Sequence, residues 1–167
     1  MTARTYTAFT DGSCINNGSL IARAGWGVLV RNPEGATMEA AGPLGDGHHP
    51  TNQRAELTAA IEALKIIKKP AVVDLYTDSK YVVLGINEWL PGWKSRGWRK
   101  SDKKPVENTD LWQVIDTLLG QCNVTAHWVK GHSGHAENEH VDALAAKAAQ
   151  FQKSHRKLIP AEETSMV

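Results

Sequence analysis

The segment DLYTDS at residues 74–79 resembles the segment AFTDGS at residues 8–13, and the pair indicates how two strands of the fold are arranged. In each, a short run of strand-favouring residues ends in Thr-Asp and is followed by small polar residues. In open α/β sheets, ligand-binding residues gather at the carboxyl ends of the strands. If the two strands are parallel neighbours, the carboxylates of Asp11 and Asp78 lie close together. The alternative is that each aspartate only caps the turn or helix that follows it.

The remaining segments predict an α/β fold with one sheet flanked by helices. Three strand-like runs occupy the first forty-five residues and suggest an antiparallel meander: TYTAFT (5–10), GWGVLVR (25–31) and ATMEAAGPLG (36–45). Beyond them, helical patterns alternate with two further strands, AVVDLYT (71–77) and VTAHWV (124–129). Because helical crossovers join parallel strands, we expect a five-stranded mixed sheet, three strands antiparallel and then two parallel.

Length and composition bound the class of protein. A chain of 167 residues and 18.3 kDa is the size of one domain. We assign the domain to residues 1–152 and expect the polar tail, residues 153–167, to be poorly ordered. No apolar run approaches a membrane span and no signal-peptide core is present, so we expect a cytoplasmic monomer without a membrane partner. Two cysteines, Cys14 and Cys122, are too few for a disulfide framework.

A third acid, Glu56, lies near the start of the first expected helix. That helix begins near Thr51 and has an apolar stripe made of Leu57, Ala60, Ile61, Leu64 and Ile67. At 100° per residue, Glu56 lies roughly 75° from the centre of the stripe. A charge at the edge of a buried face needs a partner, although a role in capping or in the helix dipole would also explain an acid there.

Convergence of Asp11, Glu56 and Asp78 would require a cation. Two carboxylates about 4 Å apart repel each other by roughly 4 kcal/mol at an effective dielectric constant of 20. Ligation by oxygen atoms alone selects hard divalent ions, so we expect Mg²⁺, or Mn²⁺, with two ions in the site. Such sites perform phosphoryl chemistry, in which one ion activates water and the other stabilises the leaving oxygen.

Residues 89–104, here called the handle, interleave basic residues with tryptophans. Six Lys and Arg fall within residues 94–104, and the tryptophans are Trp89, Trp93 and Trp98. Basic side chains contact phosphates and aromatic faces pack on sugars or bases, so the handle predicts nucleic-acid binding. The alternative is a solvated charged helix whose tryptophans belong to the core.

Five segments of the chain, in order, resemble the bacterial type 1 ribonuclease H family, over nearly the whole length to about Gln150. They are TDGSC, TNQRAEL, YTDSKYV, GWKSRGWRKSDKKPVENTDLWQ and WVKGHSGHAENEHVDALA. The resemblance implies the ribonuclease H-like mixed sheet. It also implies an endonuclease that hydrolyses the RNA strand of RNA–DNA hybrids without sequence specificity, leaving 5′-phosphate and 3′-hydroxyl ends.

The resemblance implies the catalytic residues as well. The metal-binding carboxylates would be Asp11, Glu56, Asp78 and Asp142, although periodicity alone puts Asp142 roughly 125° from the inward stripe of its helix, facing solvent. His132 matches the family's mobile catalytic histidine, and an imidazole can transfer protons near neutral pH. A zinc site formed by His132, His135 and His140 is the competing interpretation, but no cysteine pair accompanies these histidines.

The same resemblance implies the contacts with the hybrid. The handle would grip the DNA strand through Trp89, Trp93, Lys94, Arg96, Arg99, Lys100, Lys103 and Lys104. A phosphate pocket for that strand would consist of Thr51, Asn52 and Asn108, and the residues near the RNA ribose would be Cys14, Asn17 and Gln53. The chain departs from the family pattern in the long 15–25 loop, at His49, where arginine is common, and at Lys80, which replaces a polar amide.

Two other classes of function share these features. A non-catalytic module that binds hybrids would be expected to lack at least one of the four carboxylates, and all four are present. A DNA-strand transferase of this fold would be expected to need flanking domains, for which 167 residues leave little room. The nuclease is therefore the leading hypothesis.

Overall fold

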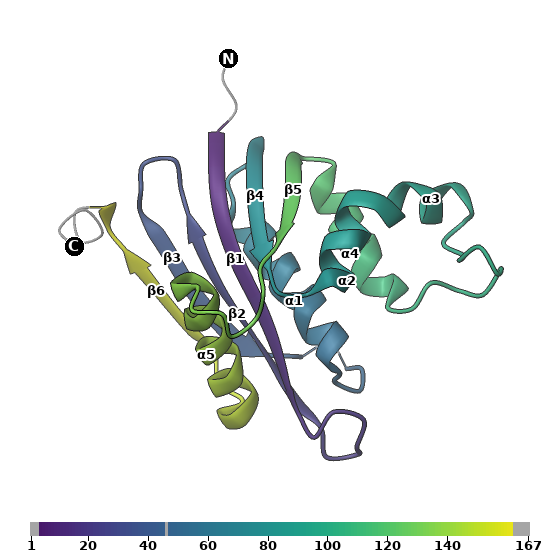
Figure 1. Cartoon of the computed structure of the whole chain (residues 1–167), viewed down its shortest axis with the longest axis horizontal. Coiled ribbons are helices and arrows are strands. Elements are labelled where there is room, and N and C mark those ends of the chain that lie inside the picture. Colours follow the sequence, from purple (N-terminus) through teal and green to yellow (C-terminus); the bar gives the residue numbers. More distant parts are fainter. Residues whose placement is uncertain (1–3, 46, 162–167) are drawn as a thin grey trace.

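The computed structural model describes residues 4–45 and 47–161, which form a mixed sheet with helices on both faces (Figure 1). The sheet has the order β5-β4-β1-β2-β3-β6. The strands are β1 (Arg4–Ile15), β2 (Arg23–Arg31), β3 (Thr37–Pro43), β4 (Ala71–Thr77), β5 (Cys122–Trp128) and β6 (His155–Ile159). β4 pairs in parallel with β1 and β5, and the other pairs are antiparallel. The predicted α/β class and the pairing of five strands are confirmed, but the sheet has a sixth strand.

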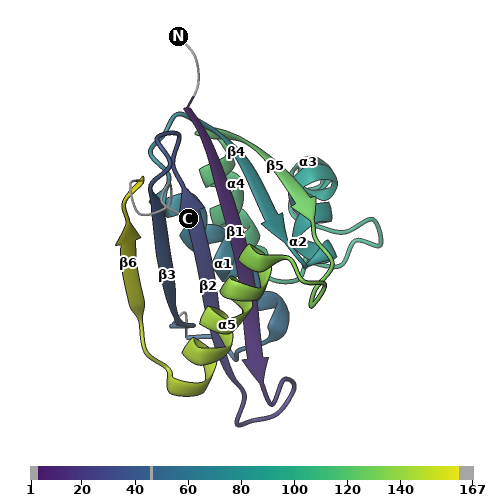
Figure 2. The same cartoon turned by 60° about the vertical axis from the view of Figure 1, so that its left-hand side comes forward.

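The helices divide unequally between the two faces of the sheet (Figure 2). They are α1 (Asn52–Ile66), α2 (Lys80–Leu84), the π-helical turn η1 (Gly85–Trp89), α3 (Leu90–Ser95), α4 (Thr109–Leu119) and α5 (Ala136–Phe151). α5 packs on one face, over β1, β2 and β3, while α1 packs on the other face together with α4. The described part of the chain contains no helix that is both long and apolar enough to cross a membrane.

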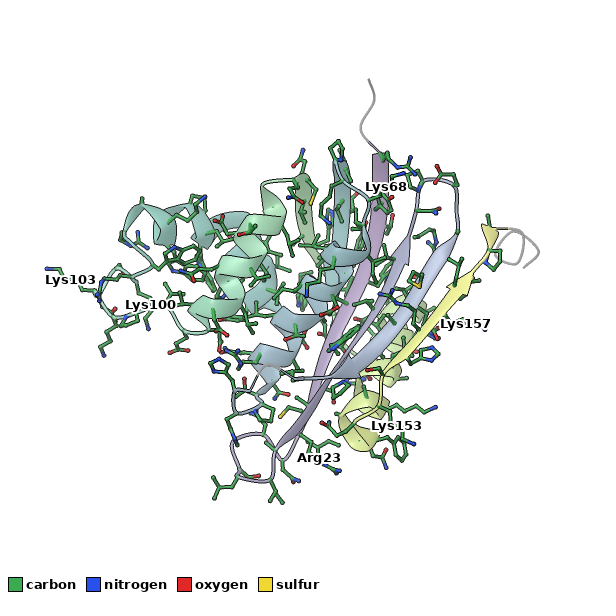
Figure 3. All side chains as sticks on the ribbon, turned by 180° about the vertical axis from the view of Figure 1, so that it is seen from behind. Arg23, Lys68, Lys100, Lys103, Lys153 and Lys157 are labelled. Atoms are coloured by element: carbon green, nitrogen blue, oxygen red, sulfur yellow. The ribbon has the colours of Figure 1, made fainter. Side chains whose placement is uncertain are left out.

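The handle projects from the body of the molecule. It consists of Trp89, at the end of η1, then α3 and the loop that follows, and it carries Lys100 and Lys103 on the side of the protein opposite β6 and Lys157 (Figure 3). A large core lies between the sheet and α1, and includes Leu57, Leu64, Val73, Leu75 and Trp112. A smaller core under α5 contains Phe9, Leu29 and Val141.

Two glycines in β2 allow α5 to lie directly on the sheet. A Cβ atom at Gly25 would stand 2.4 Å from the backbone nitrogen of Ala149, and one at Gly27 would stand 2.6 Å from the carbonyl oxygen of Val141. Any side chain at either position would push the helix away, because both contacts are with its backbone. The glycines therefore fix the height of α5 above β2, and with it the position of Asp142.

β6 corrects the prediction that the tail is poorly ordered. It pairs antiparallel with β3, with His155 opposite Ala41 and Ile159 opposite Thr37. The segment HRKLI has no clear apolar alternation and its side chains are mostly exposed, so hydrophobic periodicity carried no signal. Main-chain pairing with β3 orders the segment. Residues 162–167 of the predicted tail lie outside the described residues.

The buried acid Glu39, on β3, joins β6 to α5. Its Oε1 accepts a hydrogen bond from His140 Nε2 and its Oε2 accepts one from His155 Nε2, each at 2.5 Å. Burial acts to raise the pKa of Glu39, but the hydrogen bonds from the two imidazoles outweigh it and leave the pKa below its ordinary value. One carboxylate on β3 is therefore bonded both to α5, through His140, and to β6, through His155.

We predict that Glu39→Gln lowers the free energy of unfolding at pH 7 by about 1–3 kcal/mol, because it weakens two charge-assisted hydrogen bonds of a buried group. A depressed pKa stabilises the fold above the unfolded pKa of about 4, and this contribution is lost as the pH falls through the folded pKa. Urea unfolding at pH 7 measures the loss of stability in the variant, and urea unfolding below pH 4 tests whether that loss disappears. Glu34→Gln is the control, because Glu34 forms only an exposed ion pair with Arg4; an equal loss in that variant would contradict the account.

Candidate active site

The two strand-end aspartates lie where β1 and β4 stop pairing. The parallel register runs from Arg4 opposite Ala71 to Thr10 opposite Thr77, so Asp11 and Asp78 are the next residue on each strand. The capping alternative does not hold for Asp78, because Ser79 caps α2 by accepting a hydrogen bond from the Val82 backbone nitrogen at 3.2 Å. The predicted proximity of the two aspartates follows from parallel pairing.

Glu56 reaches the same point from α1. Gly12 makes this approach possible, because a Cβ atom there would lie 2.4 Å from the backbone of Ala55 and Glu56. The Gly12 backbone nitrogen donates a hydrogen bond to Glu56 Oε1 at 3.0 Å, and Thr77 Oγ1 donates to Oε2 at 3.5 Å. Glu56 is therefore held by the two strands that carry the aspartates, and it does not cap its own helix.

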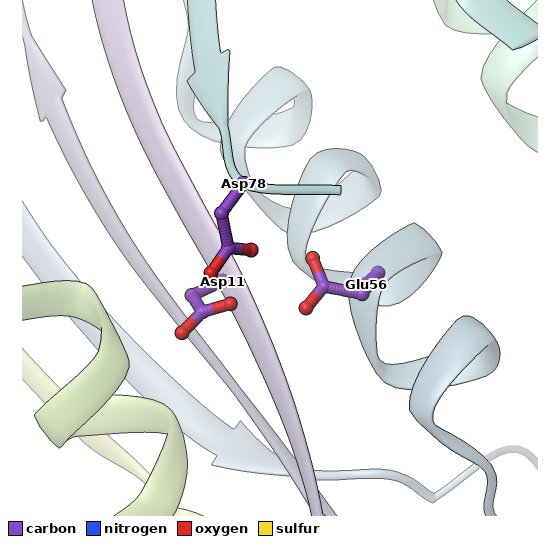
Figure 4. Close-up of side chains that lie close together, drawn as sticks. All are labelled: Asp11, Glu56 and Asp78. Carbon is purple, nitrogen blue, oxygen red and sulfur yellow. The ribbon is translucent and has the colours of Figure 1, made fainter. Parts of the chain in front are cut away.

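The three carboxylates form a cluster, here called the acid cluster: Asp11, Glu56 and Asp78 (Figure 4). One carboxylate oxygen from each residue lies within 4.8 Å of those of the other two. Asp11 is 2% exposed. A loop closes on the cluster at Gly131, where a Cβ atom would stand 2.9 Å from Asp78 Oδ2. The predicted convergence is confirmed. It results from the close contacts that Gly12 makes with α1 and Gly131 makes with Asp78.

The acid cluster is electrostatically unfavourable unless protons or cations neutralise it. Burial, followed by the charge of Glu56, raises the pKa of Asp11 to about 11. Burial is also the largest cause that raises the pKa of Glu56 to about 7. Hard divalent cations prefer such an all-oxygen set of ligands, so the donor set fits a divalent metal ion that would replace the protons.

Asp142 and His132 lie beside the cluster. Asp142 is not one of its three members, but its side chain helps to raise the pKa of Asp11 through a hydrogen bond. The Asp142 side chain is 41% exposed, and His132, whose side chain is 83% exposed, has Nδ1 4.0 Å from Asp142 Oδ2. The solvent-facing interpretation of Asp142 is thus only half right, because its side chain is partly exposed but also forms a hydrogen bond with Asp11.

The other two histidines of the zinc hypothesis have separate structural partners. His135 caps α5, since its Nδ1 accepts a hydrogen bond from the Asn138 backbone nitrogen. His140 is hydrogen-bonded to Glu39. Within residues 4–45 and 47–161, the acid cluster is the only group of three or more potential ligands that meets the geometry of a metal site. The arrangement therefore does not support a zinc site.

The predicted phosphate-pocket residues gather at the start of α1. Thr51 caps the helix by accepting a hydrogen bond from the Arg54 backbone nitrogen at 3.1 Å. Asn108, which has a positive φ of 56°, donates to Tyr81 at 3.1 Å and to Gln53 at 3.4 Å. Asn52 meets the β1–β2 loop, since its backbone nitrogen donates to Asn17 Oδ1 at 3.0 Å.

Cys14 completes this group, with its Sγ 3.8 Å from the Pro50 carbonyl oxygen. Burial raises the pKa of the Cys14 thiol. All six residues that the resemblance assigns to the phosphate pocket and the ribose contacts therefore lie around one helix N-terminus, where backbone N–H groups favour anions.

Sequence reasoning missed Arg54, which orients this pocket. Arg54 is 6% exposed, and its guanidinium donates to Asp110 at 3.0 and 2.6 Å and to Asn108 at 3.3 Å. Its position could have been found, because Arg54 precedes Leu57 and Ile61 at helical spacing and so belongs to the inward stripe. A buried guanidinium needs carboxylate and amide partners, which predicts a polar network at that end of the helix.

A second missed pair lies beside Asp78. Trp128 donates a hydrogen bond from Nε1 to the Asp78 carbonyl oxygen at 3.1 Å, and Lys80 Nζ lies 4.6 Å from the centre of the Trp128 ring. Lys80 therefore makes a cation–π contact with Trp128 beside the acid cluster.

The tryptophans of the handle divide between core and surface. Trp93 is 8% exposed and packs against the buried Trp112, whereas Trp89 is 37% exposed. Trp93 nevertheless lines a surface hollow together with Trp89, so its predicted contact with nucleic acid stays a prediction. Beside these rings lies a hollow of about 350 Å³ whose basic lining residues are Arg96 and Lys100.

The predicted basic residues of the handle have local partners. Lys94 forms an ion pair with Asp116 at 3.2 Å, and Lys100 lies 3.9 Å from Glu107. Arg96 Nε donates to the Arg99 carbonyl oxygen and Arg99 donates to that of Lys103, each at 3.1 Å, which stiffens the loop. Lys103 and Lys104 are exposed at its far end.

Comparison with known proteins gives a consistent result. Residues 3–150 match the family model for RNase H. The chain is 50% identical over 145 residues to the ribonuclease H of Cupriavidus necator, covering 86% of this chain and 94% of that protein. It is 46% identical over 149 residues to the ribonuclease H of Rhizobium meliloti, covering 89% and 93%.

Solved structures agree with the sequence comparisons. The chain resembles LC9-RNase H1, described as a type 1 RNase H with the type 2 active-site motif, with a TM-score of 0.82 and 32% identity over 100% of this chain and 83% of that chain. It also resembles the PFV RNase H domain, with a TM-score of 0.70 and 31% identity over 89% and 96%.

Proposed function

We propose, since the chain belongs to the ribonuclease H family of enzymes that hydrolyse the RNA strand of RNA–DNA hybrids, that its acid cluster is the catalytic centre of this reaction. The observation that carries the proposal is the packing of three carboxylates into one cluster that only protons or cations can neutralise. A merely structural role would not require three acids at the ends of two strands and beside a helix start.

The proposed cofactor is Mg²⁺, with Mn²⁺ as a substitute, and the residues that would hold two ions are Asp11, Glu56, Asp78 and Asp142. Bound there, the ions would activate water as the nucleophile and stabilise the leaving oxygen. Glu56 contributes a rigid ligand, since both its oxygens are held by hydrogen bonds. Asp142, which is more exposed, would complete the site from α5.

His132 is proposed to move protons or help product leave. Its loop lies against Asp78 at Gly131, and its imidazole is exposed beside Asp142. An imidazole is the side chain best suited to proton transfer near neutral pH. One chain supplies all of these groups, which supports action as a monomer.

The hybrid is proposed to lie across the handle, the start of α1 and the acid cluster. The DNA strand would contact Trp89, the basic residues of the handle and the pocket of Thr51, Asn52 and Asn108, while the RNA ribose would meet Cys14, Asn17 and Gln53. Contacts with phosphates and sugars leave the base edges unread, so cleavage would not depend on sequence. Contact with the 2′-hydroxyl would select RNA.

The test is cleavage of one labelled sequence as RNA–DNA hybrid, duplex RNA and duplex DNA, in Mg²⁺ and in chelator. We expect cutting of the RNA strand of the hybrid alone, in Mg²⁺ alone, with 5′-phosphate and 3′-hydroxyl ends. Tight binding of the hybrid without cutting in either Mg²⁺ or Mn²⁺ would contradict the proposal and favour a binding module.

A further inference from the structure

Two large apolar side chains stand at the tip of the β1–β2 loop, residues 16–22, without a covering group. Leu20 is 98% exposed and Ile21 is 71% exposed, the two highest values among the large apolar residues that the structure describes as exposed. Scattered apolar residues on a surface are ordinary, but two adjacent ones at the end of a hairpin form a single apolar tip. Leu20 and Ile21 are here called the loop tip.

The loop tip is held by a defined turn. The Ser19 backbone nitrogen donates to the Asn16 carbonyl oxygen at 3.0 Å, and the Ala22 backbone nitrogen donates to the Ser19 carbonyl oxygen at 3.3 Å. The Ile21 backbone nitrogen donates to Ser19 Oγ at 3.2 Å. These hydrogen bonds lie on both sides of the loop tip and fix its backbone with the two side chains pointing outward. Little further conformational entropy of the backbone would therefore be lost on binding.

The loop tip continues the surface proposed to contact RNA. Asn17, in the same loop, is bonded to the start of α1 through Asn52. β1 carries Asp11 and then runs four residues further to Ile15, about 13 Å at roughly 3.3 Å per residue. The loop and the start of α1 both lie at the lower end of the molecule in Figure 1. The acid cluster, the ribose contacts and the loop tip thus follow one line along β1.

The charge of this segment suits a polyanion. Residues 14–24 contain one charged residue, Arg23, and no acid. Arg23 stands at the base of the loop, where its Nη1 donates to the Gln150 carbonyl oxygen at 3.1 Å (Figure 3). A phosphate backbone passing the loop would therefore meet no repulsive charge.

We propose that Leu20 and Ile21 lie in the minor groove of the hybrid and pack on the sugar rings beyond the ribose contacts. This inference rests on the proposed function. The minor groove of an A-like duplex is wide and shallow, and it admits a loop that a narrow groove would exclude. Contacts with sugars carry no sequence information, so packing there is compatible with cleavage of any sequence. The tip would lengthen the substrate footprint on one side of the cut.

The test is the double variant Leu20→Ser/Ile21→Ser, with Leu158→Ser as the matched control. Leu158 is 60% exposed on β6, away from the proposed substrate path. On a hybrid of about 20 base pairs, we expect KM to rise about fivefold to tenfold with kcat within twofold of wild type, while the control stays unchanged. The salt dependence of binding should also stay unchanged, because no charge is removed.

A second substrate locates the contact. Shortening the hybrid on the side that faces the loop tip should raise the wild-type KM until it equals that of the double variant. An unchanged KM in the double variant, an equal rise with Leu158→Ser, or a wild-type dimer that the double variant abolishes would overturn the inference. Failure of the wild-type protein to cut any hybrid would instead defeat the proposed function.

Discussion

Asp11→Asn is expected to lower the rate of hybrid cleavage about a thousandfold or more. Removal of one carboxylate from the cluster would weaken the binding of the ions proposed to stabilise the transition state, and about 4 kcal/mol of lost stabilisation corresponds to a thousandfold. Single-turnover cleavage at saturating protein measures the chemical step. Asp74→Asn is the control, because Asp74 lies on β4, which ends just before Asp78, but is bonded to His127.

The same variant is expected to make the metal-free protein more stable, by about 1–3 kcal/mol at pH 7. The folded-state pKa of Asp11, raised to about 11, lies above the unfolded value, so folding favours the protonated acid. The unfolded chain ionises first, and the metal-free fold loses stability as the pH rises above about 4. Asparagine cannot ionise, so this loss disappears. Urea unfolding in chelator measures it, and a destabilised Asp11→Asn protein would contradict the account.

Replacement of Lys100, Lys103 and Lys104 by glutamine is expected to weaken hybrid binding more than tenfold at low salt. Each phosphate contact contributes about 0.9 to the slope of log K against log salt for a duplex, so the slope should fall by about 2–3. Because Lys100 is partly paired with Glu107, we expect the slope to fall by about 2 rather than about 3. The turnover rate at saturating substrate should not change, because the handle does not touch the acid cluster.

A matched neutralisation tests whether position or only net charge matters. Lys68, Lys153 and Lys157 lie on other parts of the surface in Figure 3, so their replacement removes the same charge without touching the handle. We expect the salt slope of that variant to stay close to wild type. An equal reduction of slope in both triple variants would mean that the handle has no particular role in binding.

The acids that follow the two strands could be predicted from sequence. Residue type predicts each strand, and the helical crossover between strands predicts their parallel pairing. Asp11 and Asp78 needed only the two Thr-Asp endings, and Glu56 needed only its angle from an apolar stripe. Asp142 could not be placed this way. A helical wheel gives only the direction of the apolar stripe, whereas Asp142 reaches Asp11 from the flank of α5, between the buried stripe and solvent.

The features that sequence reasoning missed depend on partners distant in the chain. β6 is ordered by the edge of β3 and by Glu39, and its own residues carry no apolar period. The burial of Trp93 follows from its packing against Trp112, on α4. Arg54 is the exception, since its place on the apolar stripe of α1 was visible in the sequence.

The account depends on the acid cluster as the place where the divalent ion binds. Anomalous scattering from crystals soaked in Mn²⁺ tests this most directly, with Asp11→Asn crystals beside the wild type. We predict at least one Mn²⁺ peak within coordination distance of the carboxylates of Asp11, Glu56 and Asp78, lost or much weakened in the variant. Mn²⁺ bound only elsewhere, by a protein that still cuts the hybrid in Mn²⁺, would contradict the account.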